Sequence, residues 1–360
     1  MGTAAQRISD LETLKNNLPE AERNLFNRFF RVDTMVGRLA VPAVMESWLV
    51  KNFGSLSRVT QQRITKVTNL LTLEGALFNE LRASRPMECR VNGEVRQTID
   101  QSAGDPFCHP EDGTPADLFG RVKGCHCLTA SNVAKYDGYH GIVIFDEHNP
   151  LTWSQALITD YFETAQEWGR RAYQADPDCK YFFLMWNCLW KSGASIIHGH
   201  AQMTLTKGMH YPKVEALHRV WATYKGQYNG ACYFKDLYLV HHRLGLAWEW
   251  EGVKGLAYLT PVKEKEVLLL ASEPGVPLYD AVYRVLSKYQ RLGVLSFNLA
   301  LYLPPLADTG EDWDGFPAVV RIVDRGDPNN KTADIGAMEL YAASVIASDP
   351  FRVAETMVQL

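Results

Sequence analysis

The segment Asn187-Cys-Leu-Trp-Lys-Ser-Gly-Ala-Ser-Ile-Ile-His-Gly-His-Ala-Gln202 is the most informative part of this 360-residue chain. In an extended strand, side chains two positions apart point to the same face, so we expect His198, His200 and Gln202 to line up. Gly199 and Ala201 on the opposite face are small enough to admit a neighbouring backbone. Two histidines on a strand are often ordinary half-buried residues, but this spacing also suits a site.

The residues just before this strand support the second interpretation. Lys191-Ser-Gly-Ala-Ser195 is a loop of small residues that can present several N–H donors and one lysine to phosphate oxygens. The segment therefore predicts a phosphate-binding site beside two histidines.

The flanking sequence predicts an α+β fold with a duplicated unit. Strands are expected at residues 141–145 and 181–186 with a helix between them, and strands, a helix and strands follow in the same order from residue 255 to 323. Before these units, apolar residues recur at helical spacing. We therefore expect a helical extension at 1–66, a catalytic half at 67–208 and a degenerate second half at 209–360, each half an antiparallel sheet with helices.

His198-Gly-His200-Ala-Gln202 resembles the His-x-His-x-Gln motif in the nucleotidyltransferase branch of the histidine-triad superfamily, and the resemblance extends over roughly residues 68 to 360. That branch includes galactose-1-phosphate uridylyltransferase and the phosphorylases of nucleotide sugars and dinucleoside polyphosphates. The resemblance implies that His200 is a nucleophile that forms a nucleotidyl-histidine, assisted by Gln202 and by His198. We expect a backbone carbonyl near His198 to fix the tautomer of His200. It also implies a group of phosphate-binding residues: Arg82, Arg85, Asn187, Lys191 and Ser195.

Gln202 separates two kinds of chemistry. Histidine-triad hydrolases carry a third histidine at this position, whereas glutamine cannot take up a proton and activates water poorly. Transfer to a phosphate or a sugar phosphate is therefore favoured over hydrolysis. The resemblance leaves the acceptor open, because the positions expected to bind a hexose phosphate hold Ala333 and Val345. A uridylyltransferase, a phosphorylase and a non-catalytic nucleotide-binding protein are the three alternatives.

A structural zinc ion is also implied by the resemblance. The family site uses Cys-x-x-Cys with two histidines, and the matching positions here are Asp105, Cys108, His148 and His198. Aspartate is a harder zinc ligand than thiolate. The alternative is that Cys108 is a buried thiol and that His148 caps a turn. No redox cofactor is expected.

Composition narrows the class of protein. The net charge of −4 disfavours general binding to nucleic acid or anionic membranes, so an anionic substrate needs a local cluster of donors. No apolar run approaches the length of about 20 residues that a spanning helix requires. Seven cysteines are few for this length and odd in number, which is typical of reduced thiols in a cytoplasmic protein. The expected partners are a nucleotide or nucleotide sugar, a phosphate or sugar-phosphate acceptor, and a second copy of the chain.

Overall fold

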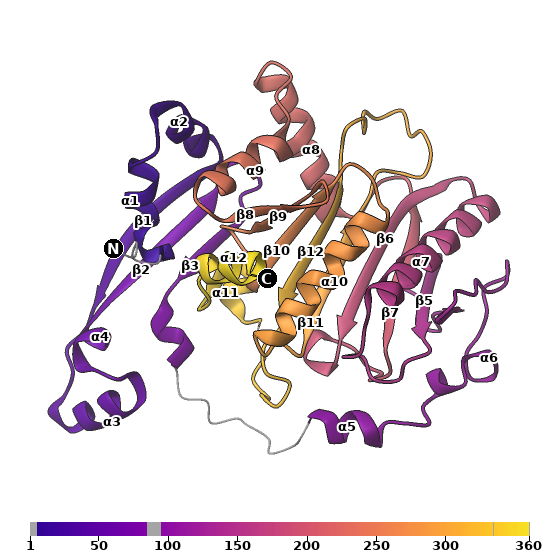
Figure 1. The fold of residues 1–360 in the computed structure, drawn as a ribbon, viewed down its shortest axis with the longest axis horizontal. Helices are drawn as coiled ribbons and strands as arrows, with labels where there is room; N and C mark the ends of the chain where they lie inside the picture. The colour runs from indigo at the N-terminus through magenta and orange to yellow at the C-terminus, as the bar shows by residue number, and fades with distance from the viewer. Residues whose placement is uncertain (1–5, 85–94, 334, 360) are drawn as a thin grey trace.

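The computed structural model describes residues 6–84, 95–333 and 335–359, and it contains two β-sheets (Figure 1). Neighbouring strands of the larger, nine-stranded sheet are all antiparallel. Its strands, in spatial order, are β4 (Cys127–Ser131), β5 (Tyr139–Phe145), β7 (His200–Lys207), β6 (Cys179–Cys188), β11 (Phe297–Tyr302), β12 (Ala318–Asp324), β10 (Glu264–Ala271), β9 (Val253–Ala257) and β8 (Ala247–Trp250).

The larger sheet contains the predicted duplication. The first unit runs β4-β5-α7-β6-β7 and the second runs β9-β10-α10-β11-β12, where α7 is Gln155–Ala175 and α10 is Val276–Arg291. Both units have the same spatial order, β4-β5-β7-β6 and β9-β10-β12-β11, and they meet where β6 pairs with β11. The α+β fold with repeated antiparallel units is therefore confirmed, and the two units share one continuous sheet.

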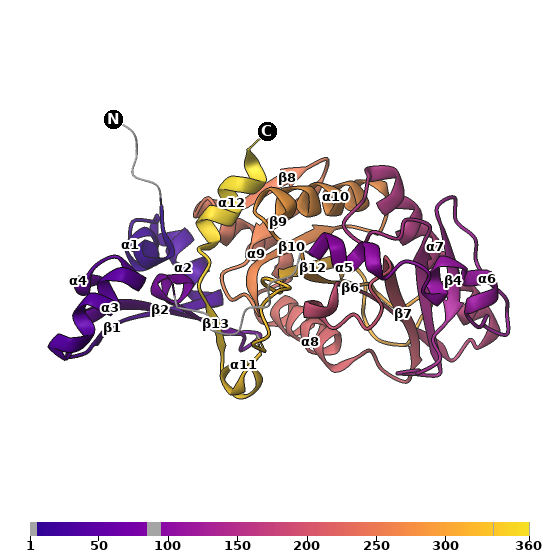
Figure 2. The same ribbon diagram turned by 90° about the horizontal axis from the view of Figure 1, so that it is seen from below.

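Helices α7 and α10 cover one face of this sheet and α8 (Pro212–Gln227) lies on the other (Figure 2). The Ser154 hydroxyl accepts a hydrogen bond from the backbone N–H of Leu157 and so caps the start of α7. Buried side chains then recur on one side of α7 at helical spacing and pack on the sheet. The other α-helices described after residue 94 are α5 (Val95–Gln101), α6 (Pro110–Gly113), α9 (Tyr233–Arg243), α11 (Ala337–Tyr341) and α12 (Pro350–Val358).

The N-terminal extension is helical only in part, which corrects the prediction for residues 1–66. It contains α1 (Leu11–Asn16), α2 (Glu20–Phe29), α3 (Ala43–Phe53) and α4 (Leu56–Thr60), but also two long strands, β1 (Phe30–Arg38) and β2 (Gln61–Asn69). These strands are rich in β-branched residues and pair in unbroken register from Phe30 opposite Asn69 to Arg38 opposite Gln61. Cross-strand pairing stabilises an extended backbone that sequence periodicity had not revealed.

The smaller sheet joins the N-terminal extension to the C-terminal segment, which contributes its last strand. Its order is β1-β2-β3-β13, where β3 is Gly75–Phe78 and β13 is Ser344–Ile346. The side chain of Arg321 donates to Glu266 at 2.6 Å within the larger sheet and to Glu74, just before β3, at 2.7 Å. Because all three side chains are largely buried, this ion-pair network links the two sheets away from bulk water.

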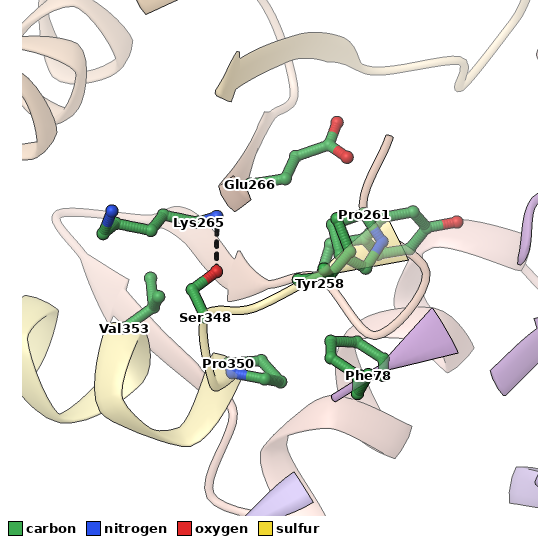
Figure 3. A pocket seen from close by; sticks show the side chains of 9 residues that line it. Phe78, Tyr258, Pro261, Lys265, Glu266, Ser348, Pro350 and Val353 are labelled. Atoms are coloured by element: carbon green, nitrogen blue, oxygen red, sulfur yellow. Dashed lines mark hydrogen bonds between the residues drawn. The ribbon is translucent and has the colours of Figure 1, made fainter. Parts of the chain in front are cut away.

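The C-terminal segment packs tightly at this junction. The backbone N–H of Lys265 donates to the hydroxyl of Ser348 at 3.1 Å, beside Tyr258 and Pro350 (Figure 3). The space between these residues and Phe78 has a volume of about 10 Å³. That is about the smallest space that holds one water molecule, so this junction is a packing contact. Within the described ranges, no helix is long and apolar enough to cross a membrane.

Candidate nucleotidyl-transfer site

His200 and Gln202 of the motif lie on β7, and their side chains point to the face of the sheet opposite α7. Gln202 is paired with Ile142 of β5 and with Met185 of β6, and His200 is paired with Ile144. Paired residues of antiparallel strands point to the same face, so this register fixes the direction of both side chains. His198 lies just before β7, and the N–H of Gly199 donates to the carbonyl of His148 at 3.1 Å. The close backbone approach expected at Gly199 is therefore present.

The imidazole of His200 is held by the backbone of the motif itself. Its Nδ1 lies 2.8 Å from the carbonyl oxygen of His198, and a carbonyl can only accept, so Nδ1 carries the hydrogen. This is the bond that the sequence predicted. Nε2 then has an unprotonated lone pair, and it forms no hydrogen bond with the residues that the structure describes. Burial lowers the pKa of His200 below its ordinary value, which favours the neutral ring. The ring of Phe107 packs against the imidazole of His200, with ring centroids 5.3 Å apart.

Gln202 is held by a residue that the sequence had not singled out. Its Oε1 lies 2.9 Å from Nε2 of His140, which is fully buried at the start of β5. One sequence signal for His140 is its place as a polar residue near the start of the otherwise apolar run that ends at Phe145.

Four potential metal ligands converge beside the motif. Nδ1 of His198 lies 3.1 Å from Nδ1 of His148 and 3.5 Å from Sγ of Cys108. Asp105 completes the group with carboxylate oxygens 3.7 Å from His198 and 3.9 Å from His148, and the four ligand atoms lie within 4.8 Å of one another. Ligands of tetrahedral zinc, at 2.0–2.3 Å from the ion, lie about 3.3–3.8 Å apart. The spacing therefore matches the size of a zinc site.

The hydrogen bonds around these ligands also fit a cation. Nε2 of His198 donates to the carbonyl of Phe145 at 2.8 Å, and Nε2 of His148 donates to the carbonyl of Ile99 at 3.0 Å. In neutral rings both Nδ1 atoms are then unprotonated, and two facing lone pairs at 3.1 Å repel each other unless a cation lies between them. Oδ2 of Asp105 is buried and has no hydrogen-bond partner among the described residues. The donor set present here thus fits a zinc ion.

The residues predicted to bind phosphate are more dispersed. Asn187, on β6, accepts a hydrogen bond from the side chain of Asn298 on β11 at 2.6 Å. The ammonium of Lys191 donates to the carbonyls of Asn330, at 3.0 Å, and Thr332, so it anchors the loop after β12. Ser195 and Arg82 are exposed, and Arg85 lies outside the described residues.

A cavity of about 650 Å³ lies on the same face of the sheet as His200 and Gln202. It is bounded by β6, β11 and β12, by α8, and by the segment around α11. Met185, which is paired with Gln202, and Asn187 both line it, so the cavity begins one strand away from the motif. Its volume lies within the range of about 300–1,000 Å³ that is usual for small-molecule sites. Asn298 and Arg325, which sequence reasoning missed, also line this cavity.

Comparison with known proteins identifies the fold. No family model and no curated protein matches the sequence. Among solved structures, an ADP-glucose phosphorylase from Arabidopsis thaliana with bound ADP-glucose is similar, with 16% identity, a TM-score of 0.61, and coverage of 81% of this chain and 98% of that one. A GalT-like protein from Arabidopsis thaliana has 16% identity and a TM-score of 0.59, with 81% and 97% covered. A uridylyltransferase has 14% identity and a TM-score of 0.55, with 68% and 87% covered.

These structures are phosphorylase and uridylyltransferase folds of the kind that the motif had indicated. The TM-scores of 0.55–0.61, at sequence identities of only 14–16%, establish similarity of architecture. The predicted resemblance is therefore confirmed at the level of the fold: the chain has the α+β fold of the uridylyltransferase and ADP-glucose phosphorylase structures.

Proposed function

We propose that the chain is a nucleotidyltransferase that carries a nucleoside monophosphate on His200 between two phosphorylated substrates. The observation that carries this proposal is the bond from Nδ1 of His200 to the carbonyl of His198, because it leaves Nε2 as an unprotonated nucleophile. The cavity that begins at Met185, one strand away from Gln202, supplies room for the substrate.

The chemistry follows in two displacements. Nε2 of His200 attacks the α-phosphorus of the donor and forms an N–P bond. The bond from that phosphorus to its bridging oxygen breaks, and the electron pair leaves with the phosphorylated leaving group. The positive charge that develops on the imidazole is stabilised by the carbonyl of His198, and the amide of Gln202 donates to a nonbridging phosphate oxygen. An incoming phosphate or sugar phosphate then attacks the same phosphorus and frees His200.

Asp105, Cys108, His148 and His198 would hold a zinc ion in this scheme. When bound, zinc supplies a structural cross-link, because four protein ligands leave no position for substrate. His198 is both a ligand and the source of the carbonyl that orients His200, so these residues link the 105–108 loop to the position of the nucleophile.

The acceptor distinguishes the two closest activities. A sugar 1-phosphate acceptor makes the chain a hexose-1-phosphate uridylyltransferase type of enzyme, and inorganic phosphate makes it a phosphorylase. The galactose-1-phosphate uridylyltransferase type is our first proposal, and a phosphorylase of nucleotide sugars or dinucleoside polyphosphates is the second, which the similarity in fold to the ADP-glucose phosphorylase supports.

Covalent labelling tests the proposal. The purified chain is incubated with UDP-glucose, ADP-glucose or diadenosine tetraphosphate that is radioactive at the α-phosphorus, and acid-labile label on the protein is measured. We expect label on the wild-type chain and on His126→Ala, which removes an exposed histidine, but none on His200→Gly. Free imidazole should restore part of the turnover of His200→Gly. Label or near-normal turnover in His200→Ala contradicts the mechanism, and nucleotide binding without label on the wild type supports the non-catalytic alternative.

A further inference from the structure

His140 is a buried histidine on the same face of the sheet as the motif. It is paired with Thr204 on β7, two positions along the strand from the pair formed by Ile142 and Gln202. Its ring is fully buried and stacks on Tyr136 with centroids 4.4 Å apart. Burial lowers the pKa of His140 below its ordinary value, which favours a neutral ring with one N–H.

The tautomer of that neutral ring is fixed by the backbone. The N–H of Tyr136 donates to Nδ1 of His140 at 2.9 Å, so the ring hydrogen must lie on Nε2. Two polar atoms lie near Nε2: the amide nitrogen of Asn132 at 3.2 Å and Oε1 of Gln202 at 2.9 Å. Oδ1 of Asn132 already accepts from the N–H of Ala134, so Asn132 presents its NH₂ group and cannot accept. Oε1 of Gln202 therefore accepts the hydrogen of His140.

This bond selects one of two orientations of the Gln202 amide. A free glutamine amide can rotate by half a turn and exchange its oxygen and nitrogen. With Oε1 bound to His140, the NH₂ group is the part of the amide left to donate elsewhere. A phosphate oxygen attracts that NH₂ group and repels a carbonyl oxygen, so only this orientation supports transfer.

We propose that His140 is a positioning residue that holds the amide of Gln202 with its NH₂ group directed to the transferred phosphate. This inference rests on the proposed function. His140 acts through Gln202, and the backbone N–H of Tyr136 sets the direction of the whole chain of hydrogen bonds.

A double-mutant cycle tests this dependence. The rate of nucleotidyl-histidine formation is measured in single turnovers for wild type, His140→Phe, Gln202→Ala and the double variant, with the radioactive donors named above. His140→Phe keeps an aromatic ring against Tyr136 but removes the donor. We expect a rate about 10- to 100-fold lower with KM nearly unchanged, less than the loss of about 100- to 1,000-fold typical when a direct oxyanion donor is removed. In the Gln202→Ala background, His140→Phe should change the rate by less than about twofold.

Two further variants separate positioning from folding. His126→Ala, which removes an exposed histidine outside this chain of hydrogen bonds, should retain the wild-type rate. His140→Gln can donate to Gln202 and accept from Tyr136, so it should recover most of the rate even if His140→Phe folds poorly. Equal effects of His140→Phe with and without Gln202, an unchanged rate in His140→Phe, or no recovery in His140→Gln would each overturn the inference alone. Absence of label on the wild-type chain would refute the proposed function and this inference together.

Discussion

Replacing Gly199 with alanine tests how tightly packing sets the position of the two motif histidines. Gly199 lies between His198 and His200, and its backbone is in contact with the end of β5. A Cβ atom at this position would lie 2.7 Å from Cδ2 of Phe145 and 3.0 Å from the carbonyl oxygen of Glu147. The first distance falls short of ordinary contact, which begins at 3.4 Å, by about 0.7 Å.

Neither neighbour can move away easily. The ring of Phe145 is stacked on Tyr161 with centroids 3.7 Å apart and lies edge-on to Trp186 at 5.1 Å. The carbonyl of Glu147 belongs to the backbone that leads to His148. The motif itself must therefore shift by several tenths of an ångström. We expect Gly199→Ala to lower the free energy of unfolding by about 1–3 kcal/mol, the usual cost of overpacking. Because a displacement of 1 Å can cost a hundredfold in rate, we expect covalent labelling to slow by about 10- to 100-fold.

Urea unfolding and single-turnover labelling measure the two effects on the same protein. Gly138→Ala is the matched control. Among the described residues other than its two chain neighbours, no heavy atom lies within 4 Å of a Cβ atom placed at residue 138. That variant should keep wild-type stability and rate. Wild-type stability together with a wild-type labelling rate in Gly199→Ala would refute the claim that close packing at this glycine positions the site.

Three further predictions concern chemistry, metal and pH. Gln202→His should increase release of nucleoside monophosphate in the absence of acceptor, because a titratable group then lies beside the intermediate; unchanged partitioning between water and acceptor would contradict this role. Removing zinc with a chelator should lower the Tm, by about 1–2 °C for each kcal/mol of binding free energy lost from a chain of 360 residues. Purified chain without zinc and a Tm indifferent to chelator would argue against the metal site. Burial lowers the pKa of His241 from 6.5 to about 4, and Nδ1 and Nε2 of its neutral ring are bonded to Leu237 and Leu259. Between pH 6.5 and pH 4 the unfolded chain therefore binds more protons than the folded chain. The contribution of His241 to the free energy of unfolding should be fully present above pH 6.5 and should fall by about 3 kcal/mol as the pH drops to 4. Urea unfolding measures this loss, which His241→Phe should remove.

Much of the larger sheet could be predicted from local sequence pattern. The helix expected between strands in residues 255–323 is α10 (Val276–Arg291), and the strand expected at 181–186 lies within β6. Alternation alone placed His200 and Gln202 on one face, because side chains of a strand have a period of two whatever the neighbouring strands are. The bond between His200 and the carbonyl of His198 is equally local, since it joins residues two apart.

Contacts between distant segments could not be predicted from pattern. The resemblance named Asp105, Cys108, His148 and His198, but only the fold shows that their ligand atoms converge. Lys191 is a phosphate-binding candidate by sequence. In the structure its ammonium donates to the carbonyls of Asn330 and Thr332, about 140 residues away in the chain.

The sequence by itself determined the periodic elements, the duplicated order and the shared face of the motif, because these depend on residues close together along the chain. Tertiary structure alone decided that residues 30–38 and 61–69 are strands, because each is stabilised by hydrogen bonds to the other across a long separation. It also decided the partner of Gln202. His140 lies 62 residues earlier in the chain, and only the register of β5 against β7 brings its Nε2 within 2.9 Å of that amide.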